Sequence, residues 1–380
     1  MAEKLSLSAR ENVTSNGIEY HRRGKAILTD NGAERGTDAA ADREPLRGDP
    51  SRPVTIAYIA ESAGVSVPTV SKVLNGKSGV SAQTRARIEE LINQHGYHKP
   101  SGSNRSNTVE LVFRELESMW AVEIIRGVER VARKHRAGLL VSEFGLHDSD
   151  VPTWDDTVAR RPNCVLSVAQ LSAAERAELS AKGIPFVVFD PTAELPDDVP
   201  FVGATNWSGG RAATRHLTDL GHRRIAMISG PEHVLFCCAR LDGYRSAMQA
   251  AGLTVDPDLV VYADLTREDG CVAARTLLAL PEPPTAIFAS NDLQALGVYQ
   301  AAREAGLRIP EDLSVVGFDD LPVVGWVDPP LTTVHQPLTE MAVAATELAL
   351  ALGRGEQAPQ IGLEIATSLT VRSSTAPPKN

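Results

Sequence analysis

The chain has 380 residues, of which 43% are hydrophobic and 23% charged, and this composition excludes disorder along the whole length. No apolar run approaches the roughly 18 residues that a membrane-spanning helix needs, and the first residues lack the apolar core of a secretory signal, so we expect a cytoplasmic protein without a membrane partner. Taken alone, the net charge of -10 argues against a nucleic-acid partner, because DNA affinity comes largely from neutralised phosphates.

The charge is distributed unevenly along the chain. Residues 1–50 carry eight basic and nine acidic residues without hydrophobic periodicity, which is typical of a disordered extension; a start site placed too far upstream would look the same. Residues 51–107 carry seven basic and three acidic residues, whereas residues 108–380 carry 23 basic and 36 acidic ones. The sequence therefore predicts a small basic module attached to a large acidic body.

Three short helices are predicted in the basic module, residues 51–98. Thr55 is placed to cap the first, Ser66 caps the second over Val67–Leu74, and Ser81 caps the third. Two helices joined by a tight turn, with a third packed across them, form a helix-turn-helix, whose second helix lies in the major groove of DNA. The alternative is a small helical domain whose Ser and Thr residues only cap helices.

The second predicted helix presents polar and small side chains between its buried positions. Three outward residues are placed to meet base edges: Val67, Pro68 and Lys72. Hydroxyl groups around this helix suit phosphate contacts, and they belong to Thr55, Ser66, Thr69 and Ser71.

The basic module resembles a known family over residues 54–97, almost without a gap. The matching runs are V-T-I-A-Y-I-A-E-S-A-G-V-S-V-P-T-V-S-K-V-L-N-G and V-S-A-Q-T-R-A-R-I-E-E-L-I-N-Q-H-G-Y, and they look like the headpiece of the lactose-repressor (LacI/GalR) family. The resemblance implies that Val67, Pro68 and Lys72 read bases. It also implies a set of phosphate contacts, made by Ser66, Thr69, Ser71, Asn75 and Ser81.

The linker, residues 99–108, departs from the pattern of the family. Much of the family inserts a leucine from this segment into the minor groove, but here the one apolar side chain is Pro100, and Ser106 falls near the leucine position. A wedge must be apolar to unstack a base step, so we do not expect this protein to kink its operator in that way. Arg105 is placed to enter a narrow minor groove instead.

Short apolar runs alternate with helical patterns in the acidic body, residues 109–376, which predicts parallel α/β sheets covered on both faces. About 270 residues exceed one open sheet of ordinary size, so we expect two lobes, residues 109–200 with 337–356 and residues 201–336 with 357–376. The predicted strands are Val109–Phe113, Leu139–Phe144, Cys164–Val168, Phe186–Phe189, Ile225–Ser229, Leu259–Tyr262, Ala286–Ala289 and Leu313–Phe318. The predicted helices are Val122–Lys134, Ala173–Lys182, Gly209–Leu220, Arg240–Ala251, Val272–Leu280 and Leu293–Ala305.

Polar residues follow several of these strands at the edge where such sheets bind ligands. Asp190, Asn291 and Asp319 each stand at a strand end, and Arg240 begins a helix shortly after another strand. Together they form a hydrogen-bonding set for a polyhydroxylated molecule, and an aromatic side chain such as Trp120 is suited to cover a sugar face. The alternative for each aspartate is a helix cap.

The resemblance continues through the acidic body to about residue 375, in blocks such as T-N-W-S-G-G-R, A-R-L-D-G-Y-R, A-S-N-D-L-Q-A-L-G-V and V-V-G-F-D-D. It implies a regulatory core similar to periplasmic sugar-binding proteins, with two Rossmann-like lobes, three crossovers and a ligand between the lobes. It places effector contacts at Asp190, Arg240, Asn291, Asp319 and Gln336, with Ser118, Trp120 and Glu123 lining the first-lobe side.

Other protein classes fit the sequence less well. A transport protein for sugars would need a signal peptide and no helix-turn-helix, and a dehydrogenase would need a Gly-rich turn where this chain has R-E-L-E-S-M-W. The neighbouring carboxylates Asp319 and Asp320 should point to opposite faces, which argues against an enzyme. The four cysteines show no C-x-x-C spacing, so we expect no metal and no cofactor.

These observations predict a repressor that is controlled by a small molecule. Two copies would place their headpieces on a near-palindromic operator, and the ending S-S-T-A-P-P-K-N, which lacks a leucine heptad, favours a homodimer over a tetramer. The acidic groups and Trp120 favour a neutral mono- or oligosaccharide as the effector. A purine or another metabolite, and a sugar-binding protein without a role on DNA, remain the alternatives.

Overall fold

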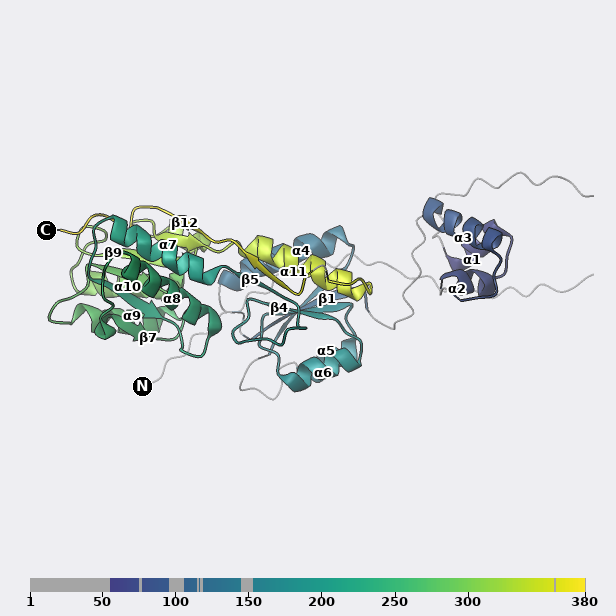
Figure 1. Cartoon of the computed structure of the whole chain (residues 1–380), viewed down its shortest axis with the longest axis horizontal. Helices are drawn as coiled ribbons and strands as arrows, with labels where there is room; N and C mark the ends of the chain where they lie inside the picture. The colour runs from purple at the N-terminus through teal and green to yellow at the C-terminus, as the bar shows by residue number, and fades with distance from the viewer. Residues whose placement is uncertain are drawn as a thin grey trace, which may run out of the picture. The chain divides into compact units, whose positions relative to one another are not determined.

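The computed structural model describes residues 55–74, 77–95, 106–114, 116, 119–144, 153–358 and 360–379 (Figure 1). The chain divides into two compact units, residues 1–99 and 100–380, and the division falls at the start of the predicted linker. The predicted extension, residues 1–50, lies outside the described residues.

The first unit is the headpiece, and its three helices are α1 (Ile56–Ala63), α2 (Val67–Leu74) and α3 (Ala82–His95). Gly64 ends α1 with a φ of 65°, a left-handed conformation that suits glycine. The helices bury one small apolar core made of Ile59, Ala60, Ala63, Val70, Val73 and Ile88. The predicted three-helix arrangement is therefore confirmed.

The second unit contains two α/β lobes. Lobe 1 has a six-stranded parallel sheet in the order β11-β5-β4-β3-β1-β2, with Val109 of β1 opposite Leu139 of the edge strand β2 on one side and Cys164 of β3 on the other. In Figure 1, α4 and α11 lie together on one face of this sheet, and α5 and α6 lie on the other. Its elements are β1 (Thr108–Phe113), α4 (Met119–Lys134), β2 (Gly138–Glu143), α5 (Trp154–Arg160), β3 (Cys164–Ser167), α6 (Ala173–Ala181), β4 (Phe186–Phe189), β5 (Phe201–Ala204), α11 (Leu338–Gly353) and β11 (Gly362–Ile365).

Lobe 2 has a second six-stranded sheet in the order β12-β10-β9-β8-β6-β7, parallel except for β12, which runs antiparallel to β10. Its helices pack in pairs, α7 with α8 and α9 with α10. Its elements are α7 (Asn206–Asp219), β6 (Ile225–Ser229), α8 (Leu235–Ala250), η1 (Pro257–Leu259), β7 (Val260–Tyr262), α9 (Arg267–Leu278), β8 (Ala286–Ala289), α10 (Asp292–Glu304), β9 (Ser314–Asp319), η2 (Pro322–Gly325), β10 (Thr332–His335) and β12 (Ser368–Thr370).

The predicted boundary between the lobes is wrong at two places. The strands β5 and β11 belong to the sheet of lobe 1, although residues 201–336 and 357–376 were assigned to lobe 2. The reason is that β5 continues the sheet beyond β4 and buries its apolar residues there, and β11 then pairs with β5. The chain therefore leaves lobe 1 after these strands rather than before them.

Three crossovers connect the lobes, as the resemblance implies. They follow β5 at Thr205, β10 at Gln336, and β11 at residues 366–367. The first and third crossovers are tied together, because Thr367 N–H donates to Thr205 Oγ1 at 2.9 Å and Thr205 N–H donates to the carbonyl of Ile365 at 3.0 Å. The two crossover segments thus continue the pairing of β5 with β11 beyond the carboxyl ends of these strands.

Candidate DNA interface and effector site

The helix α2 carries the predicted base-reading side chains on its exposed face. Val67 is 41% exposed, and Pro68 and Lys72 are also exposed. Val70 and Val73 point the other way into the headpiece core. This division follows from helical periodicity and leaves the outward face free to meet a groove.

The predicted phosphate-binding hydroxyls lie at the ends of these helices. Thr55 and Ser81 cap α1 and α3 by accepting backbone N–H bonds of 3.2 Å each. At the start of α2, the hydroxyls of Ser66 and Thr69 lie 2.9 Å apart, and Ser71 is half-buried one turn further on. A hydroxyl that accepts a cap bond still has its own hydrogen to donate to a phosphate, so both roles are compatible.

Three predicted site residues lie outside the described residues, namely Asn75, Arg105 and Ser118. Their predicted roles, a phosphate contact, a minor-groove contact and an effector contact, stay predictions.

A buried polar network joins the two lobes at the carboxyl ends of their strands. Asp190, which follows β4 of lobe 1, accepts a hydrogen bond of 3.0 Å from the Gln336 amide at the second crossover. Gln336 Oε1 in turn accepts from Arg240 of α8 at 3.2 Å. The Arg240 guanidinium also donates to Asn206 Oδ1 at 2.8 Å and lies 3.7 Å from the Asp319 carboxylate. The structure thus brings four predicted effector residues together.

Aromatic rings hold the Arg240 guanidinium in place. It lies 3.6 Å from the centroid of the Phe318 ring and 4.9 Å from that of Phe236. Arg240 is 2% exposed, so these cation–π contacts form away from water, where they are strongest. This packing fixes the direction in which the guanidinium presents its N–H groups.

Burial shifts the acidity of the aspartates in the network. It raises the pKa of Asp190, against the opposing effect of the nearby Arg240 charge. It also raises the pKa of Asp319 to about 7, again opposed by Arg240 and reinforced by the charge on Asp190. Asp190 and Asp319 have φ values of 46° and 109°, and such strained backbone is concentrated at functional sites.

The other predicted effector residues have structural partners. Asn291 caps α10 and donates its amide to the carbonyl of Leu265 at 3.0 Å. Glu123 accepts from Arg126 at 2.9 Å, and Trp120 packs edge-on against Phe189 with ring centroids 5.8 Å apart. These side chains lie beside the strand ends, but they do not line the cavity described next.

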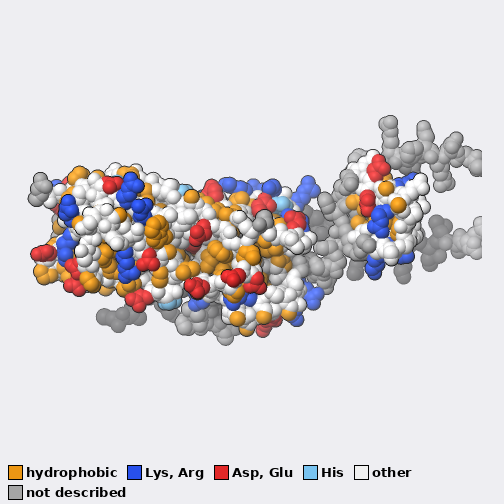
Figure 2. Space-filling view, viewed as in Figure 1, with side chains coloured by type: hydrophobic (Ala, Val, Ile, Leu, Met, Phe, Trp, Pro, Cys, Tyr) orange, Lys and Arg blue, Asp and Glu red, His pale blue; other side chains and the backbone are white. Residues whose placement is uncertain are grey.

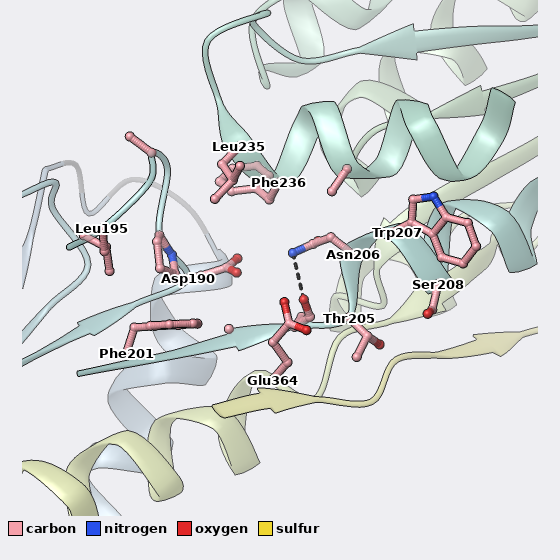
Figure 3. A pocket seen from close by; sticks show the side chains of 15 residues that line it. Asp190, Leu195, Phe201, Thr205, Asn206, Trp207, Ser208, Leu235, Phe236 and Glu364 are labelled. Atoms are coloured by element: carbon pink, nitrogen blue, oxygen red, sulfur yellow. Dashed lines mark hydrogen bonds between the residues drawn. The ribbon is translucent and has the colours of Figure 1, made fainter. Parts of the chain in front are cut away.

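A cavity of about 410 Å³ opens next to the polar network, within the usual range for small-molecule sites. Figure 3 shows the carboxyl groups of Asp190 and Glu364 pointing toward Asn206, with Phe236 above them and Trp207 to one side. Asp190 is the one residue that the cavity shares with the predicted effector set. The lining comes from both lobes: Asp190, Pro191, Ala193, Leu195, Phe201, Gly203, Ala204, Thr205, Asn206, Trp207, Ser208, Leu235, Phe236, Ala239 and Glu364.

Sequence reasoning missed the aromatic part of this lining. Trp207 is 44% exposed in the first turn of α7, and Phe236 lies in the first turn of α8, which begins five residues before its predicted start at Arg240. The run T-N-W could have indicated Trp207 as a lining residue. This tryptophan stands directly after a strand and before a Gly-rich helix start, and such positions lie at the ligand-binding edge. The cavity therefore has its own aromatic side chains in place of Trp120.

The described residues contain no group of three His, Cys, Asp or Glu side chains that could hold a metal ion. Burial raises the pKa of the Cys237 thiol, which lies in α8 near Arg240, to about 11, so this thiol is not a nucleophile at neutral pH. Asp319 and Asp320 have separate partners, Arg240 and Arg372. No helix in the described part of the chain has the length and apolar character to cross a membrane.

The two units match two protein-family descriptions. Residues 55–100 match "Bacterial regulatory proteins, lacI family", and residues 214–375 match "Periplasmic binding protein-like domain". The HTH-type transcriptional repressor CytR of Escherichia coli (strain K12) is 34% identical over 331 residues, which cover 84% of this chain and 96% of that protein.

Solved structures agree with these matches. A complex of the transcriptional regulator CelR with cellobiose has a TM-score of 0.65 and 33% identity, and covers 85% of this chain and 100% of that one. The lac repressor dimer bound to operator and the anti-inducer ONPF has a TM-score of 0.63 and 27% identity, and covers 86% and 100%. The named relatives are transcriptional regulators, in agreement with the predicted non-enzymatic role.

Proposed function

Because the chain belongs to the LacI family of bacterial regulatory proteins, we propose that it is a cytoplasmic, homodimeric repressor whose affinity for a near-palindromic operator is set by a neutral sugar bound between its lobes. The observation that carries this proposal is the buried link from Asp190 through Gln336 to Arg240, beside a cavity with walls from both lobes. A ligand there contacts both lobes at once and so favours one lobe angle over another.

The chemistry of the lining supports a neutral, polyhydroxylated effector. Two carboxylates, Asp190 and Glu364, and the amide of Asn206 offer acceptors and donors for sugar hydroxyls. Trp207 and Phe236 offer apolar faces for the C–H side of a sugar ring. Among the described residues, no Lys or Arg belongs to the lining, which disfavours a sugar phosphate. The similar CelR structure contains cellobiose, a neutral sugar.

A thermal-shift screen tests the effector class. The purified protein is heated with glucose, cellobiose, ribose, adenine or glucose 6-phosphate, and we expect a neutral sugar to raise the midpoint because it binds the folded state alone. At 100 times the dissociation constant, the expected stabilisation is about 2.7 kcal/mol. Stabilisation by adenine alone would replace the sugar by a purine effector, the alternative raised by the sequence.

Variants of residues in and beside the cavity test whether the sugar binds there. We expect Trp207→Ala to weaken sugar binding at least tenfold, because it removes the exposed aromatic face of the lining, and Arg240→Ala to abolish the response of operator binding to the sugar. Trp326→Ala is the matched control, since Trp326 is 76% exposed and lies outside the cavity. Equal sugar affinity in the Trp207 variant and the control would move the effector site elsewhere.

A Lys72 variant tests how the headpiece reads DNA. If the exposed Lys72 reads a base, Lys72→Ala relaxes the preference at one operator position in a binding assay over all single-base variants. A uniform loss over all sequences would make Lys72 a phosphate contact instead.

A further inference from the structure

The helices α4 and α5 end at the edge of lobe 1 where the chain from the headpiece enters. Ser106 and Asn107 stand just before β1, and the neighbouring strands begin beside them: Gly138 N–H donates to the carbonyl of Asn107 at 2.9 Å, and Asn163 N–H donates to that of Thr108 at 2.8 Å. In a parallel α/β sheet the helices end where the strands begin, so this amino edge collects the residues that follow the helices.

Two arginines close these helix ends in a conformation that normally belongs to glycine. Arg136 after α4 has a φ of 53°, and Arg161 after α5 has a φ of 49°. The corresponding left-handed positions after five other helices of the core are glycines, namely Gly183, Gly221, Gly252, Gly306 and Gly355. A side chain in this conformation costs about 1 kcal/mol relative to glycine. The two helices that flank the start of β1 therefore end in arginine, although glycine would be less strained at both positions.

The same two arginines are held against the entering chain. The carbonyl of Arg161 accepts from the N–H of Ser106 at 2.9 Å, and the carbonyl of Arg136 accepts from the Asn107 side-chain amide at 2.8 Å. The backbone of each arginine is thus anchored beside the start of β1.

These two arginines differ from their basic neighbours in having no carboxylate partner among the described residues. Arg133 and Lys134 of α4 pair with Glu129 and Glu347, and Arg160 pairs with the buried Glu110. Arg136 and Arg161 are exposed, and no described residue pairs with either side chain. Figure 2 shows Lys and Arg side chains at the end of lobe 1 that α4 and α5 reach. This edge is therefore locally basic on a core with 13 more acidic than basic residues.

The position of this edge along the chain points to its partner. Residues 96–105 alone separate the end of α3 from Ser106, and ten residues span at most about 35 Å. Of the folded core, this edge is thus the part closest along the chain to the helices that hold DNA. Guanidinium groups bind phosphate oxygens in a bidentate manner, which makes arginine the suitable cation.

We propose that Arg136 and Arg161 form a second DNA-contact surface, the lobe 1 edge, which binds phosphates of the operator backbone outside the segment read by the headpiece. This inference rests on the operator binding proposed above. The contact reads no bases, so it strengthens binding to every sequence equally and adds to the salt dependence.

The test uses the full-length protein and substitutions that the backbone favours. Arg136→Gly with Arg161→Gly removes both charges, and glycine suits both φ values, so we expect the thermal midpoint to stay at or above that of the original protein. Arg136→Lys with Arg161→Lys keeps the charge in the same strained positions. Arg223→Ala with Arg303→Ala removes two exposed cations of lobe 2 that have no side-chain partner among the described residues.

Operator affinity is then measured over a series of salt concentrations. We expect the glycine variant to lower the slope of log Kd against log salt by about 0.9 for each phosphate that it no longer binds, and to weaken operator and unrelated DNA by the same factor. The lysine variant should recover most of the slope, and the lobe 2 variant should match the original protein. An unchanged slope in the glycine variant overturns the inference while operator binding stands. Failure of the original protein to prefer any operator overturns both.

Discussion

Gln336 hydrogen-bonds to Asp190 across the boundary between the lobes, with 3.0 Å between its amide nitrogen and the carboxylate oxygen. Gln336 is 1% exposed and Asp190 is 5% exposed, so water does not compete for this bond. The same amide accepts from Arg240 through its oxygen. One side chain at a crossover therefore satisfies a carboxylate of lobe 1 and a guanidinium of lobe 2.

We expect Gln336→Ala to lower the free energy of unfolding by about 1–3 kcal/mol, because Asp190 Oδ2 and Arg240 Nη2 each lose a buried hydrogen bond. Urea denaturation measures the loss. Gln249→Ala is the control, since Gln249 is exposed on α8, and its change should stay within about 0.5 kcal/mol. Equal stability of the two variants would show that water replaces the amide.

The close packing of α7 on α8 predicts a strong effect of Gly243→Ala. A Cβ at Gly243 would lie 2.2 Å from the carbonyl oxygen of Trp207, so the helices must separate. We expect a loss of about 1–3 kcal/mol or more, together with weaker sugar binding, because α7 carries Asn206 and α8 carries Arg240. Gly138→Ala has its nearest contact at 3.6 Å and should be tolerated. Calorimetric melting and sugar titration of both variants check the prediction.

The raised pKa of Asp319 predicts a pH dependence of stability. The folded protein keeps the Asp319 proton up to about pH 7, whereas the unfolded chain releases it near pH 4. The folded state therefore binds more protons between these values, and this group lowers the stability as pH rises from 4 to 7. We expect Asp319→Asn to remove this contribution, so that the difference in unfolding free energy between variant and original protein grows in favour of the variant from pH 5 to pH 8. A constant difference over this range would place the pKa of Asp319 near its ordinary value.

A substitution in the small core of the headpiece should impair operator binding without affecting the core unit. Ile88 is fully buried there, so Ile88→Ala should cost about 2–5 kcal/mol and abolish operator binding. The core unit does not contain this residue, so its melting transition and sugar affinity should stay unchanged. Ile361→Ala, at a position 44% exposed in the core, should leave operator binding intact. Loss of sugar affinity in the Ile88 variant would contradict the independence of the two units.

Sequence patterns predicted several elements with a clear burial pattern. The run Phe186–Phe189 is buried at every position and appears as β4 with unchanged ends, and Val67–Leu74 appears as α2 because its apolar residues follow a helical period. The patterns missed two helices and four strands, namely α5, α11, β5, β10, β11 and β12. Of these, β11 and β12 lie at the sheet edges, and their residues are partly buried or exposed. Edge strands bury little apolar surface, so their sequences resemble loops.

Four residues of the polar network were predictable, but Asn206 and the bonds of the network were not. Asp190 follows β4 of lobe 1 and Asp319 ends β9 of lobe 2, so each was predictable at the ligand-binding edge of its own sheet. Arg240 lies close to both carboxylates. The sequence does not reveal which donors the protein itself occupies, and Asn291 turns inward to bond Leu265. The place of Trp207 in the cavity depends on where α7 begins, and helix ends are the least certain feature of a pattern.

The bonds between Thr205 and Thr367 limit how the lobes move. These hydrogen bonds hold the first and third crossovers side by side, so they oppose sliding of one crossover past the other. The lobes should therefore open and close by hinge bending at the crossovers. On this view the effector sets a single angle, and ligands of different size would hold the protein at different points along one path.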